Sequence, residues 1–167
     1  MKKRLLTTIL LAGIMVLGQA QISIADARIL TPGTNVTVKG LVLNGAELGD
    51  IRYIQDNTGN IAAFGATLLD GVLRGDSIQV TGPLFNYNSL LEISPVSSVT
   101  VINSGNPLPA PTSITTVSGY IESFEAKLVT VNAALFTETG TFSTAGSGTN
   151  YDITDAAGTA QVRVVTS

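Results

Sequence analysis

Apolar and polar residues alternate with a period of two along most of the chain after residue 26, a pattern typical of β-strands with one buried face. The alternation predicts five strands, over 36–43, 51–55, 60–64, 78–82 and 90–94. Residues 99–102 either extend an edge of the same sheet or pair elsewhere. No segment keeps a helical period over several turns, and residues 66–73 are the only helix that we predict, of one or two turns. The pattern therefore predicts an all-β fold.

Short polar residues and glycines separate the predicted strands. The sequence Asp56-Asn-Thr-Gly59 predicts a tight turn between the second and third strands. We expect Asp76 to accept hydrogen bonds from backbone amides, Pro83 to end regular pairing or mark a bulge, and Gly40 to permit a strong bend in the first strand. Alternation assigns seven residues to the core: Val36, Val38, Val42, Ile54, Ile78, Val80 and Ile93.

The N-terminus has the three parts of a secretory signal peptide. Lys2, Lys3 and Arg4 precede an apolar run over 5–18, and Gly18-Gln-Ala20 places small residues at a cleavage site. The run is shorter than the ~20 apolar residues of a membrane-spanning helix, which disfavours an anchor. We predict that residues 1–20 are a signal peptide and that the protein is exported to the periplasm, the cell surface or the medium, without membrane insertion after cleavage.

Composition removes most catalytic chemistries. The 167 residues include no His, Cys or Trp. The chain therefore lacks an imidazole base, a thiol nucleophile, a disulfide and the His and Cys ligands of zinc sites. Glu122 and Glu125 come closest to a carboxylate pair, and their context is typical of solvated charges. We expect no enzymatic activity, no cofactor and no metal site.

Charge limits the ligands that the protein can bind. The formal net charge is −3, and removing three of the nine basic residues with the leader leaves six basic against twelve acidic residues, or −6. Non-specific binding of nucleic acid needs several contacts from Lys and Arg to phosphates. An oligosaccharide or a protein ligand has no such requirement.

A proline-rich segment over 105–116 separates two related regions and predicts a linker. Two motifs recur across it: Val38-Lys-Gly40 as Val117-Ser-Gly119, and Ile54-Gln-Asp56-Asn-Thr-Gly59 as Ile153-Thr-Asp155-Ala-Ala-Gly158. We predict a domain over 28–104 and a partial second copy over 117–167, with an insertion around Phe136–Tyr151. Either the chain is a piece of a longer protein with a downstream domain, which we favour, or the second region packs onto the first.

The order of strands and motifs resembles the OB-fold. The resemblance is carried by Val36-Thr-Val-Lys-Gly40, Tyr53-Ile-Gln-Asp56-Asn-Thr-Gly59, Leu73-Arg-Gly-Asp76-Ser-Ile-Gln-Val-Thr-Gly82 and Leu91-Glu-Ile93. These motifs are similar to OB-type domains of secreted bacterial proteins, including those beside extracellular nucleases, and tandem copies behind a leader resemble surface or secreted proteins of Bacteroidota. The resemblance implies a five-stranded OB-type barrel followed by a partial second OB-like β unit.

The resemblance also implies a binding surface, because OB-folds bind oligonucleotides and oligosaccharides across their second and third strands and the flanking loops. Tyr53 is expected on that outer surface and Arg52 on the core side or its edge, while Phe64 faces either the core or the surface. The candidate ligand-binding residues are Tyr53, Phe85, Tyr87, Lys39, Arg52 and Arg74.

The leading hypothesis is a non-catalytic binding module for single-stranded nucleic acid. One alternative is a structural or adhesion module that contacts glycan or protein. Another is a periplasmic stress-type OB protein that binds cationic ligands, a family that normally has one domain.

Overall fold

The computed structural model describes residues 20–142 and 148–165, so the predicted signal peptide lies outside the described residues except for Ala20. A seven-stranded sheet forms the N-terminal unit, in the order β1-β2-β3-β4-β6-β5-β7. Its elements are β1 (Gln21–Ile22), α1 (Ile24–Arg28), β2 (Asn35–Val42), the short 3-10 helix η1 (Ala46–Leu48), β3 (Ile51–Gln55), β4 (Asn60–Phe64), β5 (Ser77–Tyr87), β6 (Leu90–Ile93) and β7 (Ser98–Asn103).

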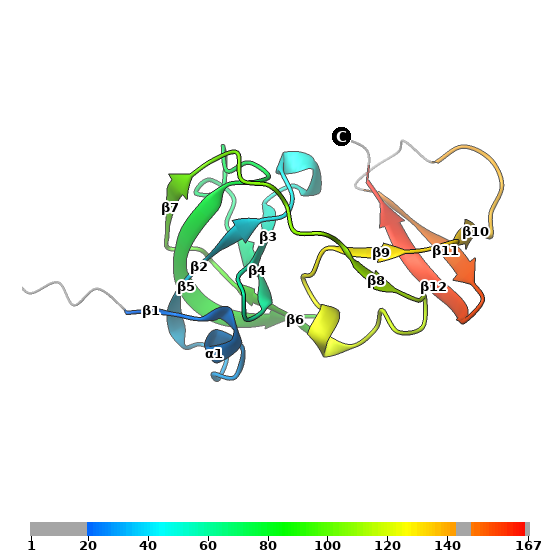
Figure 1. Ribbon diagram of the computed structural model, residues 1–167. Coiled ribbons are helices and arrows are strands. Elements are labelled where there is room, and N and C mark those ends of the chain that lie inside the picture. The colour runs from blue at the N-terminus through cyan, green and yellow to red at the C-terminus, as the bar shows by residue number, and fades with distance from the viewer. Residues whose placement is uncertain (1–19, 143–147, 166–167) are drawn as a thin grey trace, which may run out of the picture.

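Five of these strands close into a barrel, because β2 pairs with β5 as well as with β3. The ring runs β2-β3-β4-β6-β5 and back to β2, with β4 and β6 parallel and the other pairs antiparallel. Figure 1 shows β5 curving around the ring. A closed five-stranded barrel of this connectivity is the OB-fold, as the sequence predicts.

The core of the barrel holds every residue that the alternation assigns to it, and all seven are at most 2% exposed. Ile24 and Ala27 of α1 are also fully buried in this core. The packed unit therefore begins upstream of residue 28, the predicted domain boundary.

Two residues shape the barrel strands. A Cβ at Gly40 would lie 2.9 Å from the Gln55 carbonyl oxygen, so a side chain at this position would collide with β3 where β2 bends. Pro83 lies where β5 changes partner: its pairing with β2 ends at Asn35–Pro83, and its pairing with β6 begins at Leu84–Ile93. Pro83 thus marks an exchange of partners within one continuous strand, rather than the end of the strand.

The predicted helix over 66–73 is wrong. These residues form successive turns, with Gly71 at a positive φ of 78° that a helix does not allow. The observed helix is α1, which begins where the Ser23 hydroxyl accepts a hydrogen bond from the Asp26 amide at 3.0 Å. Sequence periodicity missed α1 because it is five residues long. Within the described residues no helix is long and apolar enough to cross a membrane.

The C-terminal unit consists of small sheets. The parallel pair is β8 (Thr112–Ile114) with β9 (Val129–Val131), the antiparallel sheet is β10 (Leu135–Phe136), β11 (Thr149–Asp155) and β12 (Gly158–Val164), and η2 (Glu122–Phe124) is a 3-10 helix. β8 lies inside the predicted linker. Gly119 lies in a turn, where its amide donates to the Thr115 carbonyl at 3.2 Å, and not on a strand as the match with Gly40 predicts.

An ion-pair cluster joins the two units. The Arg28 guanidinium in α1 contacts Glu122 and Glu125, the latter at 3.0 Å, and Glu125 also accepts a hydrogen bond from the Leu91 amide of β6. The prediction that both glutamates are solvated charges is wrong for Glu125, whose side chain is largely buried. This cluster holds η2 against the barrel.

A candidate ligand-binding face

The outer face of the barrel wall formed by β3, β4, β6 and β5 carries aromatic side chains from β3, β4 and β5. Pairing places Tyr53 opposite Ala62, Ala62 opposite Glu92 and Glu92 opposite Phe85, which makes one row across four strands. Side chains two residues apart on a strand share a face, so Tyr87 belongs to the same surface. We call this surface the aromatic face and define it by Tyr53, Phe64, Phe85, Tyr87, Leu48, Ile51, Leu90 and Glu92.

The aromatic face is open to solvent and hollowed. Phe64, Phe85 and Tyr87 are 41%, 49% and 58% exposed. A hollow of about 480 Å³ is lined by these three rings with Glu92, and an adjoining hollow of about 410 Å³ is lined by Tyr53 and by residues 126–128 of the second unit. Leu48 and Leu90 line both hollows, so the two form one continuous surface. Exposed apolar surface rimmed by polar groups is typical of a binding site.

A carboxylate lies at the centre of this face. Glu92 is only 5% exposed, and its burial raises the pKa of its carboxyl group, an effect that a hydrogen bond from Ser94 partly offsets. The pKa of Tyr53 is also raised, first by burial and then by the negative charges of Glu92 and Glu125. The centre of the face is therefore negative when Glu92 is ionised.

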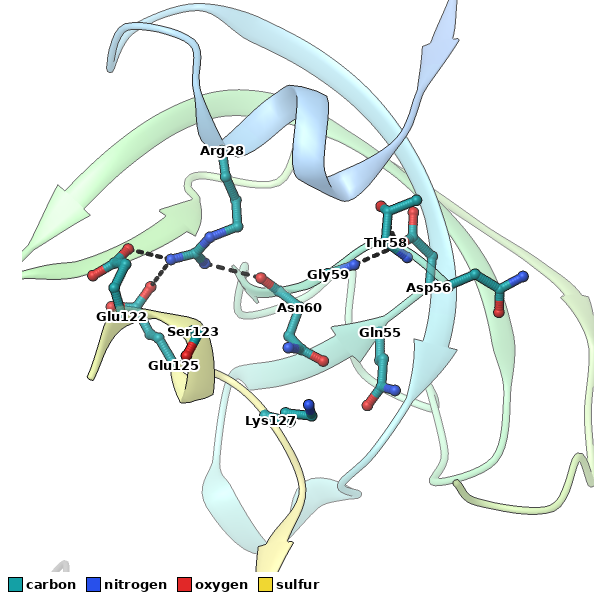
Figure 2. Close-up of a pocket in the computed structure, with 11 residues that line it drawn as sticks. Arg28, Gln55, Asp56, Thr58, Gly59, Asn60, Glu122, Ser123, Glu125 and Lys127 are labelled. Carbon is teal, nitrogen blue, oxygen red and sulfur yellow. Dashed lines mark hydrogen bonds and ion pairs between the residues drawn. The ribbon is translucent and has the colours of Figure 1, made fainter. Parts of the chain in front are cut away.

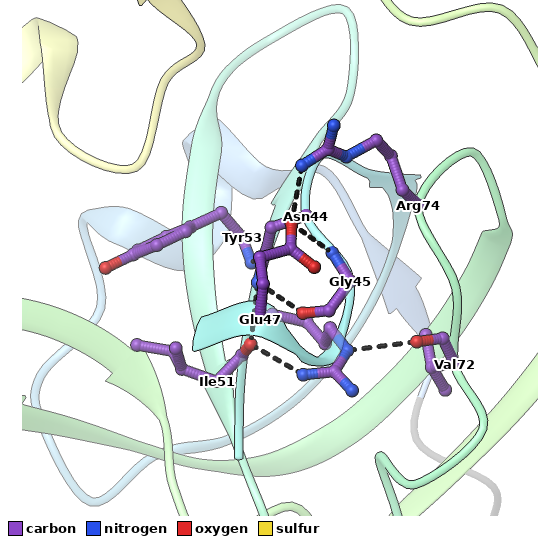
Figure 3. A network of polar contacts seen from close by, with 8 residues as sticks. Asn44, Gly45, Glu47, Ile51, Tyr53, Val72 and Arg74 are labelled. Carbon is purple, nitrogen blue, oxygen red and sulfur yellow. Dashed lines mark hydrogen bonds and ion pairs between the residues drawn. The ribbon is translucent and has the colours of Figure 1, made fainter. Parts of the chain in front are cut away.

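A network of hydrogen bonds fixes Tyr53 and the loop beside it (Figure 3). The Tyr53 amide donates to the Asn44 side-chain oxygen at 2.7 Å, and the Asn44 amide group donates to the Ile51 carbonyl at 2.9 Å. Glu47 accepts from the Gly45 amide at 2.9 Å and pairs with Arg74 at 2.5 Å. The Gly45 amide is the main reason that the pKa of Glu47 is lowered. The loop over 44–47, which lines the Tyr53 hollow, is thus held in place by these polar contacts.

Arg52, one of the predicted ligand-binding residues, does not reach the aromatic face. It is 2% exposed, and its guanidinium donates to four backbone carbonyls. Two of these acceptors, Leu69 and Val72, belong to the turns over 66–73. Arg52 therefore holds the segment 66–73 against the barrel and is not part of the aromatic face.

The structure brings some of the other candidates together and separates one. Tyr53, Phe85 and Tyr87 share the aromatic face, and Arg74 lines the same hollow as Tyr53. Lys39 lies elsewhere, in a hollow with Gln21, Gln55 and Asp56. Sequence reasoning missed Leu48, Leu90 and Glu92, although Glu92 stands between Leu91 and Ile93 and so alternates outward.

A polar cavity of about 280 Å³ lies between the β3–β4 hairpin, α1 and η2 (Figure 2). Arg28 crosses it, pairing with the two glutamates of the ion-pair cluster and donating to the Asn60 carbonyl at 2.9 Å. The Asp56 carboxylate accepts from the Thr58 hydroxyl and from the Ile24, Thr58 and Gly59 amides. Most of these groups satisfy one another, but among the described residues the buried Asn60 side-chain oxygen has no hydrogen-bond partner.

The chain is similar in sequence to a segment of a known endonuclease. No protein-family model matches the chain. It is 31% identical over 150 residues to the endonuclease YhcR of Bacillus subtilis (strain 168), in a match that covers 82% of this chain and 12% of YhcR. The chain therefore corresponds to a small part of that enzyme's length.

Among solved structures, the hypothetical protein YgiW of E. coli superposes with a TM-score of 0.43 and 20% sequence identity. That match covers 50% of this chain and 90% of YgiW. The assignment of the OB-fold rests on the strand pairing of the barrel itself.

Proposed function

We propose that the protein is a non-catalytic binding module that holds its ligand by stacking on the aromatic face. The observation that carries the proposal is that Tyr53, Phe85 and Tyr87 share one hollowed outer face of the barrel, where Phe85 and Tyr87 are exposed. Aromatic rings offer a large contact area and a flat face to planar or ring-shaped ligand groups. OB-folds bind oligomers on this side of the barrel.

The charges around the face favour a neutral oligomer, and we propose an oligosaccharide. Arg74 is already paired with Glu47, and Arg52 is buried on backbone carbonyls. Lys127 lines the Tyr53 hollow, and its ammonium lies 5.6 Å from the centroid of the Phe124 ring. The ionised Glu92 would repel a phosphate placed above the row, whereas it would accept hydrogen bonds from sugar hydroxyls. The apolar faces of sugar rings would stack on Phe85 and Tyr87.

Single-stranded nucleic acid is the second candidate, and the similarity to part of an endonuclease favours it. Bases would stack on the same rings, with a contribution of about 1–3 kcal/mol for each stacked base. With few cations on the face, such binding would depend weakly on salt, in contrast to binding dominated by phosphate contacts. Export by the N-terminal leader is part of the proposal for either ligand.

Fluorescence anisotropy with two kinds of labelled probe tests the proposal. The probes are neutral hexasaccharides of cello-, chito- and malto- type and a short oligothymidylate, each at low and at moderate salt. We expect a hexasaccharide to bind, and Phe85→Ala or Tyr87→Ala to weaken that binding about tenfold or more, equivalent to about 1.4 kcal/mol. Phe136→Ala is the matched control, because this ring is exposed to a similar degree but lies on the second unit.

The outcomes separate the two ligands. Hexasaccharide binding that is lost in the face variants and kept in Phe136→Ala supports the oligosaccharide. Oligothymidylate binding with the same pattern supports nucleic acid instead. Absence of binding to both probes, or binding that survives both face substitutions, overturns the proposed site.

A further inference from the structure

The outer face of the barrel has an open half and a covered half. Alternation places the side chains of Asn60, Ala62 and Phe64 on the same outer side of β4. Phe64 is 41% exposed, whereas Ala62 and Asn60 are 0% and 7% exposed. Glu92, which pairs with Ala62 from β6, is only 5% exposed. The aromatic face is therefore the open part of a longer surface.

A segment of the C-terminal unit lies over the covered half. We call it the strap and define it as residues 122–128, which begin with η2. Its residues line the polar cavity together with Gln55 and Asn60, and they line the Tyr53 hollow. Figure 1 shows η2, in yellow, beside β6, and Figure 2 shows the side chains of Gln55 and Asn60 extending toward Lys127 of the strap. The strap therefore crosses the outer face of β3 and β4, the strands on which OB-folds bind their ligands.

Polar contacts attach the strap to the barrel. The Glu125 carboxylate accepts a hydrogen bond from the Leu91 amide at 3.2 Å and another from the Arg28 guanidinium at 3.0 Å. Arg28 also pairs with Glu122. Every residue of the strap is exposed or half-buried, so its release would uncover little apolar surface. Charged groups, rather than buried apolar side chains of its own, therefore hold the strap in place.

Two features make the covered position costly in free energy. The buried side-chain oxygen of Asn60 has no hydrogen-bond partner among the described residues, and an unsatisfied buried acceptor is unfavourable. Ala126, within the strap, has a φ of 59°, in the left-handed region that residues with a Cβ disfavour. Strained backbone of this kind is frequent in ligand clamps and switch segments. Both costs lower the free energy that a competing ligand needs to displace the strap.

We propose that the strap occludes a second part of the ligand-binding face, and that an oligosaccharide longer than the open part displaces it. The released surface presents the side chains of Gln55 and Asn60, which are paired across β3 and β4, beside the Tyr53 ring. Side-chain amides donate and accept hydrogen bonds and so match sugar hydroxyls, while the ring offers a stacking surface. The unpartnered Asn60 oxygen then accepts from a hydroxyl of the ligand. The strap's role rests on the proposed function, because it extends the same oligosaccharide site.

A spin label on the strap reports its position with or without a ligand. The chain has no cysteine, so Ser123→Cys on the exposed surface of η2 provides a single attachment site. Ser123 lines the same cavity as Gly59 and Asn60, so the label should broaden the NMR signals of those two amides. Addition of a neutral hexasaccharide of cello-, chito- or malto- type should restore the signals. A disaccharide of the same type fits the open half and should leave them broad.

Arg28→Gln tests the attachment of the strap. Loss of the guanidinium should reduce the broadening by the label in the free chain, because both glutamates of the strap lose their partner. It should also tighten hexasaccharide binding about tenfold, since the closed fraction of molecules lowers the apparent affinity. Disaccharide binding should not change. A purely structural role for Arg28 would weaken binding instead. Arg163→Gln is the matched control, because it removes the same charge from β12.

The results distinguish a failure of the strap from a failure of the aromatic face. If a hexasaccharide binds while Gly59 and Asn60 stay broad, the strap is not displaced and its proposed role is overturned, although the aromatic face stands. The same holds if Arg28→Gln changes neither the broadening nor the affinity. Absence of hexasaccharide binding by both the parent chain and Arg28→Gln overturns the oligosaccharide site and the occluded part together.

Discussion

Arg52 and Tyr53 are neighbours on β3 and point to opposite sides of the barrel wall. Arg52 faces inward and donates to four backbone carbonyls, while Tyr53 lines a hollow on the aromatic face. A buried guanidinium is stable only when its donors are satisfied, because an unpaired buried charge is costly. The same strand therefore supplies one residue to the buried network and one to the proposed binding face.

Replacing Arg52 should destabilise the barrel strongly. Arg52→Met keeps much of the side chain's volume but leaves the carbonyls of Leu69 and Val72 without this donor. We expect a loss of about 3 kcal/mol in the free energy of unfolding, measured by urea denaturation. Arg74→Met removes an exposed ion pair and should cost less than about 1 kcal/mol. Similar losses for the two variants would show that the buried network contributes little.

Asp56 should make the stability of the barrel depend on pH. Burial alone would raise its pKa, but the Thr58 hydroxyl and the amides of Ile24, Thr58 and Gly59 outweigh burial and lower the pKa. A lowered folded pKa means that the carboxylate stabilises the protein above its unfolded pKa of about 3.9. That contribution is lost as the pH falls through the folded value.

Urea denaturation of Asp56→Asn at neutral and at acidic pH measures this contribution. The variant should be less stable than the parent chain at neutral pH, and the difference should shrink as the pH falls through the folded pKa. Asp70→Asn, on an exposed turn, is the control and should change the free energy of unfolding little at neutral pH. A difference that stays constant with pH would contradict the role of the carboxylate.

At the scale of elements, strands and turns could be predicted from the sequence because each is determined locally. Alternation located the five barrel strands, and Asp56 and Gly59 located the hairpin. The turns over 66–73 could not be predicted as such, because they are held by Arg52 from a distant strand. The match of Gly119 to Gly40 is wrong because it rests on two identical residues, Val and Gly. The position of Gly119 is set by hydrogen bonds instead: its amide donates to the Thr115 carbonyl within a turn, and the Thr116 amide of that turn donates to Asp155.

Gly40 tests whether the bend of β2 is required. In Gly40→Ala the new Cβ would meet the Gln55 carbonyl oxygen at 2.9 Å, so β2 and β3 must separate locally. We expect a loss of about 1–3 kcal/mol in the free energy of unfolding, the usual cost of overpacking. Lys39→Ala on the adjacent exposed position should change stability little. If both variants unfold alike in urea, the close approach of the strands is not needed.

At the scale of the whole molecule, the two units differ in how much they bury. Among the described residues, the buried apolar side chains all lie at or before Val96. The second unit is held by hairpin hydrogen bonds, by exposed aromatic contacts and by the ion-pair cluster around Arg28. Burial of apolar surface is the main source of folding stability, so the barrel should be the more stable unit.

Hydrogen exchange followed by mass spectrometry should show this difference directly. Amides in β11 and β12 are expected to exchange at lower denaturant than amides in β2 and β5, because local opening requires little loss of buried contacts. A single exchange transition shared by both units in the free chain would show that they unfold together.

Chemical-shift mapping by NMR can show directly whether the aromatic face binds the ligand. The isotope-labelled chain is titrated with the neutral hexasaccharides and with the oligothymidylate. We expect the amides that shift on binding to cluster on β3, β4, β6 and the end of β5, around Tyr53, Phe85 and Tyr87. Shifts confined to β1, β7 or the C-terminal unit, or no shifts with either probe, would contradict it.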